Sequence, residues 1–216
     1  MIFENSQDTW SIDLWPDITD IGLKISGGAD SAIVAYMLAL YVTKERPEIT
    51  IHPVTIIADT KPYQYIYACA VLRKIEELTG IVFAKHQYTT TDAKNNYVGG
   101  QEAFMDSLYK RELFSFHYAG ITANPSEDDA PQLYTDDTDL PTDDRSKQLV
   151  KKDNWQLPLV NVDKRGVAEH YNRLGVMEEL FPLTRSCEQN DVYTFEKHCE
   201  VCWFCKERYY GFNRYV

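Results

Sequence analysis

Strand-like and helix-like segments alternate four times along this chain, and this alternation limits the possible fold more than any other feature. Four apolar or β-branched runs predict strands, at residues 21–25, 49–58, 81–88 and 114–122. Segments of helical length and composition follow these runs, at residues 31–44, 62–80, 100–112 and 164–175. Strands separated by helices pair in parallel, with helices on both faces of the sheet. The sequence therefore predicts an α/β fold with a doubly wound parallel sheet.

Residue types at the ends of these segments support the helix assignments. Pro62 lies near the start of the second predicted helix and Gly80 at its end, which are the positions these residues prefer. Asp163 is a plausible N-cap of the fourth helix, which we expect to end at Gly175.

Acidic residues are concentrated in one segment. Eight of the 33 acidic residues lie in residues 127–144, which contain no basic residue, so most of the net charge of −11 comes from there. The rest of the chain is near charge balance and has no basic stripe, which makes a nucleic-acid partner unlikely. The acidic, proline-punctuated run predicts a solvated loop over about 123–150, and a lid over a site is the alternative.

The length and composition indicate a folded domain. With 216 residues, of which 44% are hydrophobic, the chain can bury one core and carry a small appendage. No apolar stretch reaches the roughly 18 residues of a membrane span, and the first residues lack the features of a signal peptide. We therefore expect a cytoplasmic protein with no membrane partner, and a homodimer remains open.

The turn between the first predicted strand and helix, residues 26–31, reads Ser-Gly-Gly-Ala-Asp-Ser. Its backbone N–H groups and the positive end of the helix form an anion-binding turn, to which Ser26 and Ser31 add hydroxyl donors. Those N–H groups belong to Gly27, Gly28 and Ala29. Asp30 would repel phosphate unless it caps the helix or helps to hold a cation such as Mg²⁺. The turn is neither a Walker loop, since Gly28 stands where lysine is required, nor a G-x-G-x-x-G loop.

Four of the five cysteines fall within the last thirty residues, with the spacing C-x11-C-x2-C-x2-C. They are Cys187, Cys199, Cys202 and Cys205. Four thiolates can bind one tetrahedral zinc ion, which is the preferred interpretation, with an iron–sulfur cluster or inert thiols as alternatives. His198 could replace one cysteine as a ligand, although we expect it to face solvent. Cys69 is interpreted as a core thiol.

The loop at residues 26–31 is similar to the S-G-G-x-D-S loop of the PP-loop, or N-type, ATP pyrophosphatases. Together with the cysteines, it makes the chain resemble the 7-cyano-7-deazaguanine synthase family of the queuosine pathway from about residue 21 to 212. That family ends in T-x-S-C, a spacer, C-x-x-C-x-x-C and an Arg-containing helix ending near Gly-Phe. The matching residues besides the cysteines are Thr184, Ser186, Arg208, Gly211 and Phe212, and Lys164 matches a lysine before the late helix.

The resemblance implies an adenine nucleotide alpha hydrolase-like fold and an ATP-dependent carbon–nitrogen ligase. In that reaction a 7-carboxy-7-deazaguanine carboxylate attacks the α-phosphorus of ATP, ammonia displaces AMP to form an amide, and a second activation dehydrates the amide to the nitrile. The expected catalytic residues are Ser26, Asp30, Ser31 and Lys164. The expected nucleotide-binding residues are Ser26, Gly27, Gly28, Ala29, Asp30, Ser31, Asp59 and Thr60. The implied cofactors are ATP, Mg²⁺ and a structural Zn²⁺, and Arg185 and Trp203 are candidates for lining a base pocket.

The resemblance also implies two units, a PP-loop domain over residues 1–183 and a zinc segment over residues 184–216. Two stretches depart from the family pattern, at residues 58–67 and 123–132. The departures leave open a diverged phage or defence-system relative with another acceptor. Another PP-loop enzyme, such as a tRNA thiolase or an amidating ligase, and a zinc-stabilised binding module without catalysis are the further alternatives.

Overall fold

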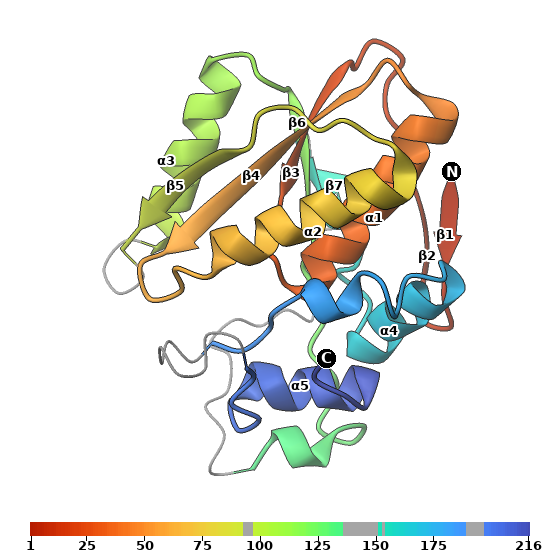
Figure 1. Ribbon diagram of the computed structural model, residues 1–216, viewed down its shortest axis with the longest axis vertical. Helices are drawn as coiled ribbons and strands as arrows, with labels where there is room; N and C mark the ends of the chain where they lie inside the picture. Colours follow the sequence, from red (N-terminus) through yellow and green to blue (C-terminus); the bar gives the residue numbers. More distant parts are fainter. Residues whose placement is uncertain (93–96, 136–150, 153, 189–196) are drawn as a thin grey trace.

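The computed structural model describes residues 1–92, 97–135, 151–152, 154–188 and 197–216, and it contains a six-stranded sheet (Figure 1). The strand order is β5-β4-β3-β6-β8-β7, and the first five strands in this order run parallel while β7 is antiparallel. The strands are β3 (Asp20–Lys24), β4 (Thr50–Ala58), β5 (Gln87–Thr91), β6 (Phe116–Ala119), β7 (Lys151–Lys152) and β8 (Trp155–Gln156). The predicted α/β fold with a parallel sheet is confirmed.

Five α-helices accompany the sheet in the described ranges. They are α1 (Ala29–Glu45), α2 (Gln64–Thr79), α3 (Tyr97–Lys110), α4 (Lys164–Arg173) and α5 (Trp203–Phe212). Two 3-10 turns, η1 (Pro131–Leu133) and η2 (Phe181–Leu183), complete the helical elements. None of these helices is both long and apolar enough to cross a membrane.

Helices cover both faces of the sheet because successive strand residues point to opposite sides. Ile21 and Leu23 of β3 belong to the main hydrophobic core, to which α1 and α2 contribute. Val54 and Ile56 of β4 point to the other face and pack with Met105 of α3 in a second cluster. Figure 1 shows α1 and α2 together in front of the sheet, with α3 on its far side.

The chain reverses its direction of travel across the sheet between β3 and β6. From β3 it moves to β4 and β5, and it then returns to form β6 on the opposite side of β3. Ligands of such sheets bind beyond the carboxyl ends of the strands at this switch point. Gly120, directly after β6, lies so close to α1 that an added Cβ would be 2.6 Å from the backbone N of Ser31. The carboxyl end of β6 therefore lies directly against the start of α1.

The structure corrects part of the sequence-based strand assignment. The third strand is residues 87–91, whereas residues 81–86, which supplied most of the predicted apolar run, are outside any strand. Ile81 is buried in the main core below the end of α2, and Val82 is 83% exposed. The true strand, Gln-Tyr-Thr-Thr-Thr, lies at the sheet edge, where half-exposed, β-branched residues are favoured.

Several short elements were not predicted. A hairpin of β1 (Ile2–Glu4) and β2 (Thr9–Ser11) precedes β3, and two-residue pairings form β7 and β8. Helix α5 packs against α4, and Figure 1 shows the two helices below the sheet.

The acidic segment is only partly a solvated loop. Leu133 of η1 is fully buried and packs with Trp203 of α5, so this portion lies against the C-terminal helix. Residues 136–150, which hold the rest of the predicted loop or lid, lie outside the described residues.

Candidate nucleotide site and cysteine centre

The Ser-Gly-Gly-Ala-Asp-Ser turn joins β3 to α1 at the switch point. Gly27 has a φ of +79°, a left-handed conformation that favours glycine, and an added Cβ would be 2.5 Å from the Cβ of Tyr67. The hydroxyl of Ser31 accepts from the backbone N of Ser26 at 3.2 Å and donates to the carbonyl of Gly28 at 3.1 Å. Gly28, the N-cap residue of α1, has no capping side chain, so within the described part of the chain the N–H groups of the first turn can bind an anion.

Asp30 does not cap α1, because its carboxylate is held by Lys164. The Lys164 Nζ donates to Asp30 Oδ2 at 2.5 Å and to Thr122 Oγ1 at 3.2 Å, and it lies 3.4 Å from Oε2 of Glu207. Lys164 is 3% exposed and Glu207 is fully buried. The cation thus offsets the charge of Asp30 near the anion-binding turn. The other oxygen, Asp30 Oδ1, is buried and has no hydrogen-bond partner among the described residues.

Local sequence explains how Lys164 reaches this position. Asp163 is the N-cap of α4, and its carboxylate accepts from the backbone N–H groups of Arg165 and Gly166, as predicted. Lys164 is therefore the first helical residue. Gly211 of α5 lies against it so closely that an added Cβ would be 2.4 Å from Lys164 Cβ. The glycine near the end of the chain lets α5 cover this lysine.

A cavity of about 160 Å³, cavity 1, lies between the turn and the C-terminal segment. It brings together residues from five separate parts of the chain. Its lining includes Ser26, Asp30, Lys61, Gln64, Lys164, Arg185, Glu188, Phe204 and Glu207. The polar and charged side chains converge where the turn opens, so the cavity suits a charged ligand.

The segment before the cysteines is attached directly to the turn. The backbone N of Arg185 donates to the carbonyl of Gly27 at 2.9 Å, and Tyr63 Oη donates to the carbonyl of Cys187 at 2.6 Å. Lys61 forms an ion pair with Glu188 across cavity 1. The guanidinium of Arg185 lies over the ring of Tyr63, 4.7 Å from its centroid.

A second cavity of about 190 Å³, cavity 2, lies on the other side of the turn. Ser26 and Ser31 line it together with Gly120 at the end of β6 and Ile56 of β4. Asp59 and Thr60, which follow β4, are outside the lining of cavities 1 and 2. Their predicted role in nucleotide binding stays a prediction. Lys61, which lines cavity 1, and Gln64, which lines both cavities, were missed.

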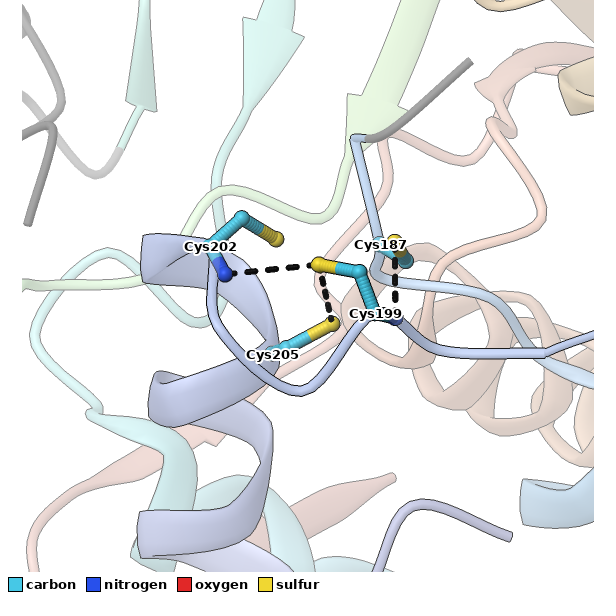
Figure 2. Close-up of side chains that lie close together, drawn as sticks. All are labelled: Cys187, Cys199, Cys202 and Cys205. Carbon is cyan, nitrogen blue, oxygen red and sulfur yellow. Dashed lines mark hydrogen bonds between the residues drawn. The ribbon is translucent and has the colours of Figure 1, made fainter. Parts of the chain in front are cut away.

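The four C-terminal cysteines meet in space, and Figure 2 shows their sulfur atoms turned toward one another. All four Sγ atoms lie within 4.8 Å of one another, close to the spacing of about 3.8 Å expected for ligands around one tetrahedral zinc ion. Two of the sulfur atoms also lie near backbone N–H donors. The backbone N of Cys202 lies 3.4 Å from Cys199 Sγ, and the N of Cys199 lies 3.4 Å from Cys187 Sγ. The cluster could hold a metal ion, as the spacing predicted.

The electrostatics of the cluster favour a cation. Interaction with the Cys187 sulfur raises the pKa of Cys202 to about 11, and contacts with Cys187 and Cys202 raise the pKa of Cys205 further. Sulfurs this close together retain their protons unless a positive charge stabilises the thiolates.

Arg208 of α5 forms hydrogen bonds with the Thr-x-Ser-Cys sequence at residues 184–187, so the arginine and this sequence form one structural unit. Its guanidinium is fully buried and donates to Thr184 Oγ1 at 2.9 Å and Ser186 Oγ at 3.1 Å. It also donates to the carbonyls of Phe181 and Tyr215. Burial lowers the pKa of Arg208 to about 10, so the group remains charged at neutral pH. These bonds join α5 to the segment that carries Cys187.

The structure corrects the predictions for His198, Trp203 and Cys69. His198 is not solvent-facing, because its ring stacks on Tyr215 and its Nε2 lies 3.4 Å from the backbone N of Ser186. Trp203 packs in the cluster with Leu133 and does not line cavity 1, whereas Arg185 does. Cys69 is only partly buried and lies 3.8 Å from Nδ1 of His86.

No model of a known protein family matches the chain, and no curated protein matches it. Among solved structures, it is similar to the U34-tRNA thiolase NcsA from Methanococcus maripaludis with its 4Fe-4S cluster, at 15% identity and a TM-score of 0.44. The match covers 74% of this chain, which spans 57% of the thiolase's length.

Proposed function

We propose that this protein is a PP-loop ATP pyrophosphatase that adenylates the carboxylate of a small heterocycle and transfers the acyl group to ammonia. The single observation that carries this proposal is the turn at residues 26–31, which presents an uncapped helix start at the switch point of a parallel sheet. An anion-binding turn without a lysine suits a pyrophosphate leaving group, because its N–H groups stabilise charge that develops as the bond breaks.

The residues around the turn have different roles in this reaction. Ser26, Ser31 and the N–H groups of residues 27–29 bind the pyrophosphate. Asp30 Oδ1, which is buried without a partner, is the oxygen that we assign to Mg²⁺, since this ion prefers carboxylate ligands. Lys164 holds Asp30 in place and adds positive charge beside the reacting phosphates. When bound, Mg²⁺ would withdraw charge from the phosphate oxygens.

The preferred acceptor is a 7-carboxy-7-deazaguanine-like carboxylate. Its oxygen attacks the α-phosphorus, the bond to the bridging oxygen breaks, and pyrophosphate leaves. Ammonia then attacks the acyl carbon, AMP leaves, and the nitrogen loses a proton to give the amide. In a second round the amide oxygen is adenylated, and loss of AMP with the remaining nitrogen protons yields the nitrile.

We further propose that the cysteine centre holds a structural zinc ion. Four sulfurs within 4.8 Å support a single ion, because the cysteines of a four-iron cluster bind different irons and stand farther apart than ligands of one metal. Four protein ligands leave no open position for a substrate. Metal analysis should find about one zinc per chain in a colourless protein, whereas a brown protein with iron and sulfide would contradict this assignment.

The test of function is incubation with Mg-ATP, ammonium and 7-carboxy-7-deazaguanine, followed by mass spectrometry. We expect AMP, pyrophosphate, and amide and nitrile products. Asp30→Ala should abolish AMP formation without changing the zinc content. ATP cleavage to ADP, or the absence of AMP with every carboxylate tested, would contradict the proposal. AMP formation only with tRNA and a sulfur donor would instead indicate a thiolase.

A further inference from the structure

A third cavity, cavity 3, opens on the α3 face of the sheet. Its volume is about 540 Å³, which is within the usual range for small-molecule sites. It lies between α3, the end of β6, and β8, and its apolar lining includes Met105, Ile121, Trp155 and Leu157. Cavity 3 adjoins cavity 2, because Lys24, Gln101, Ala119 and Ile121 line both. A molecule bound against these four residues is therefore next to the cavity beside the anion-binding turn.

The charges in this cavity are arranged asymmetrically. Lys24, the last residue of β3, donates to Gln101 Oε1 at 2.9 Å and forms no ion pair within 4.0 Å among the described residues. Burial lowers the pKa of the Lys24 ammonium. His117, on the floor, is neutral, because burial lowers its pKa to about 3. Lys24 is thus the only cation among the described lining residues, and a half-buried ammonium with no carboxylate partner among those residues favours an anionic ligand.

Two acids of α3 also line cavity 3. Glu102 and Asp106 lie one helical turn apart on the exposed side of α3 and line the cavity. A carboxylate accepts two parallel N–H bonds, such as those offered by a ring N–H and an adjacent amino group. The cavity therefore combines a half-buried lysine, an apolar lining and two exposed carboxylate acceptors.

We propose that cavity 3 is the acceptor site, and that it binds a planar, amino-substituted heterocycle whose carboxylate lies against Lys24. Lys24 lines cavity 2 as well, so a carboxylate there is next to the turn that we assign to the departing pyrophosphate. Lys24 is then a positioning and binding residue for the acceptor, and α3 determines which ring is accepted. This inference rests on the proposed function and adds the location and chemistry of the acceptor.

The test compares two ligands on matched variants by calorimetry, with α,β-methylene-ATP present. The ligands are 7-carboxy-7-deazaguanine and 7-deazaguanine, which lacks the carboxylate. Lys24→Met should weaken the carboxylate ligand about tenfold or more and leave 7-deazaguanine unchanged, because only the former loses a charge-assisted bond. Lys110→Met, at the exposed end of α3 and outside the lining of cavity 3, is the control and should change neither affinity. Glu102→Gln with Asp106→Asn should weaken both ligands.

Three other outcomes would contradict the inference. Equal effects of Lys24→Met on both ligands would overturn the inference, as would loss of affinity in Lys61→Met with none in Lys24→Met, which would place the acceptor in cavity 1. If the wild-type protein binds neither ligand, the inference also fails. AMP formation from Mg-ATP with a different acceptor would then still support the proposed function.

Discussion

Lys164→Met should destabilise the protein strongly, because the substitution removes the cation that contacts the half-buried Asp30 and the fully buried Glu207. Lys164 is 3% exposed, its Nζ contacts Asp30 Oδ2 at 2.5 Å, and Glu207, at 3.4 Å, is fully buried. Removing one partner of a buried ion pair typically costs about 3–5 kcal/mol. That is a large part of the roughly 5–15 kcal/mol by which a domain is stable.

A double-mutant cycle separates this charge effect from lost packing. Glu207→Gln alone should cost about 1–3 kcal/mol, because it removes the charge that pairs with Lys164 at 3.4 Å in a buried site. In the double variant of Lys164→Met with Glu207→Gln, one uncompensated carboxylate is gone, so the combined cost should be at least about 1 kcal/mol below the sum of the single costs.

Guanidinium unfolding of the metal-loaded protein at neutral pH, followed by circular dichroism, measures these free energies. Arg173→Met is the matched control on the same helix. Arg173 pairs with Glu169 but is 47% exposed, so its loss should cost less than about 1 kcal/mol. Additive effects of Lys164→Met and Glu207→Gln, or a cost of Lys164→Met similar to that of the control, would refute the reasoning.

Three further predictions follow from the site and the core. Cys202→Ser should reduce bound metal and lower the thermal midpoint, while Cys69→Ser leaves the metal content unchanged; equal metal content in both, measured by mass spectrometry, would exclude Cys202 as a ligand. Gly120→Ala should weaken ATP binding, measured by calorimetry, because its Cβ would be 2.6 Å from the backbone of α1; unchanged affinity would show that the turn tolerates the shift. Burial lowers the pKa of His86 from 6.5 to about 4. Because the unfolded chain binds a proton at a higher pH than the folded protein, the free energy of unfolding is highest above about pH 6.5 and decreases as the pH falls toward 4. Urea unfolding across this range should show a shallower pH dependence for His86→Gln, and an unchanged slope would contradict the assignment.

The sequence predicts the central elements well where long apolar segments define them. Residues 31–44 lie in the expected helix, which is buried on nearly all sides, and the strand expected at residues 49–58 is observed at residues 50–58. The third strand was misplaced because local hydrophobicity at residues 81–86 reflects packing below α2, whereas the edge strand is polar. The hairpin and β7–β8 were missed because strands of two or three residues have no measurable period.

The candidate site was only partly predictable, for a related reason. The turn and the cysteines have fixed spacing within a few residues, so their geometry follows from the local sequence. The roles of Glu207 and Lys24 depend on residues that are distant in the sequence. Glu207 pairs with Lys164, and Lys24 donates a hydrogen bond to Gln101. The one sequence signal for Lys24 was a lysine inside an otherwise apolar strand, which is unusual for a buried segment.

Helix α5 carries a cysteine of the cluster and, two residues later, the carboxylate that contacts Lys164. Cys205 and Glu207 therefore have a fixed rotational phase, since each helical residue turns the chain by about 100°. A single inserted residue between them would rotate Glu207 away from Lys164 while leaving all four cysteines in the sequence. Related chains that keep the cysteine cluster and the buried carboxylate should tolerate a substitution of the residue between Cys205 and Glu207 but no insertion or deletion there. The Cys-x-Glu spacing therefore identifies such chains more selectively than the four cysteines alone.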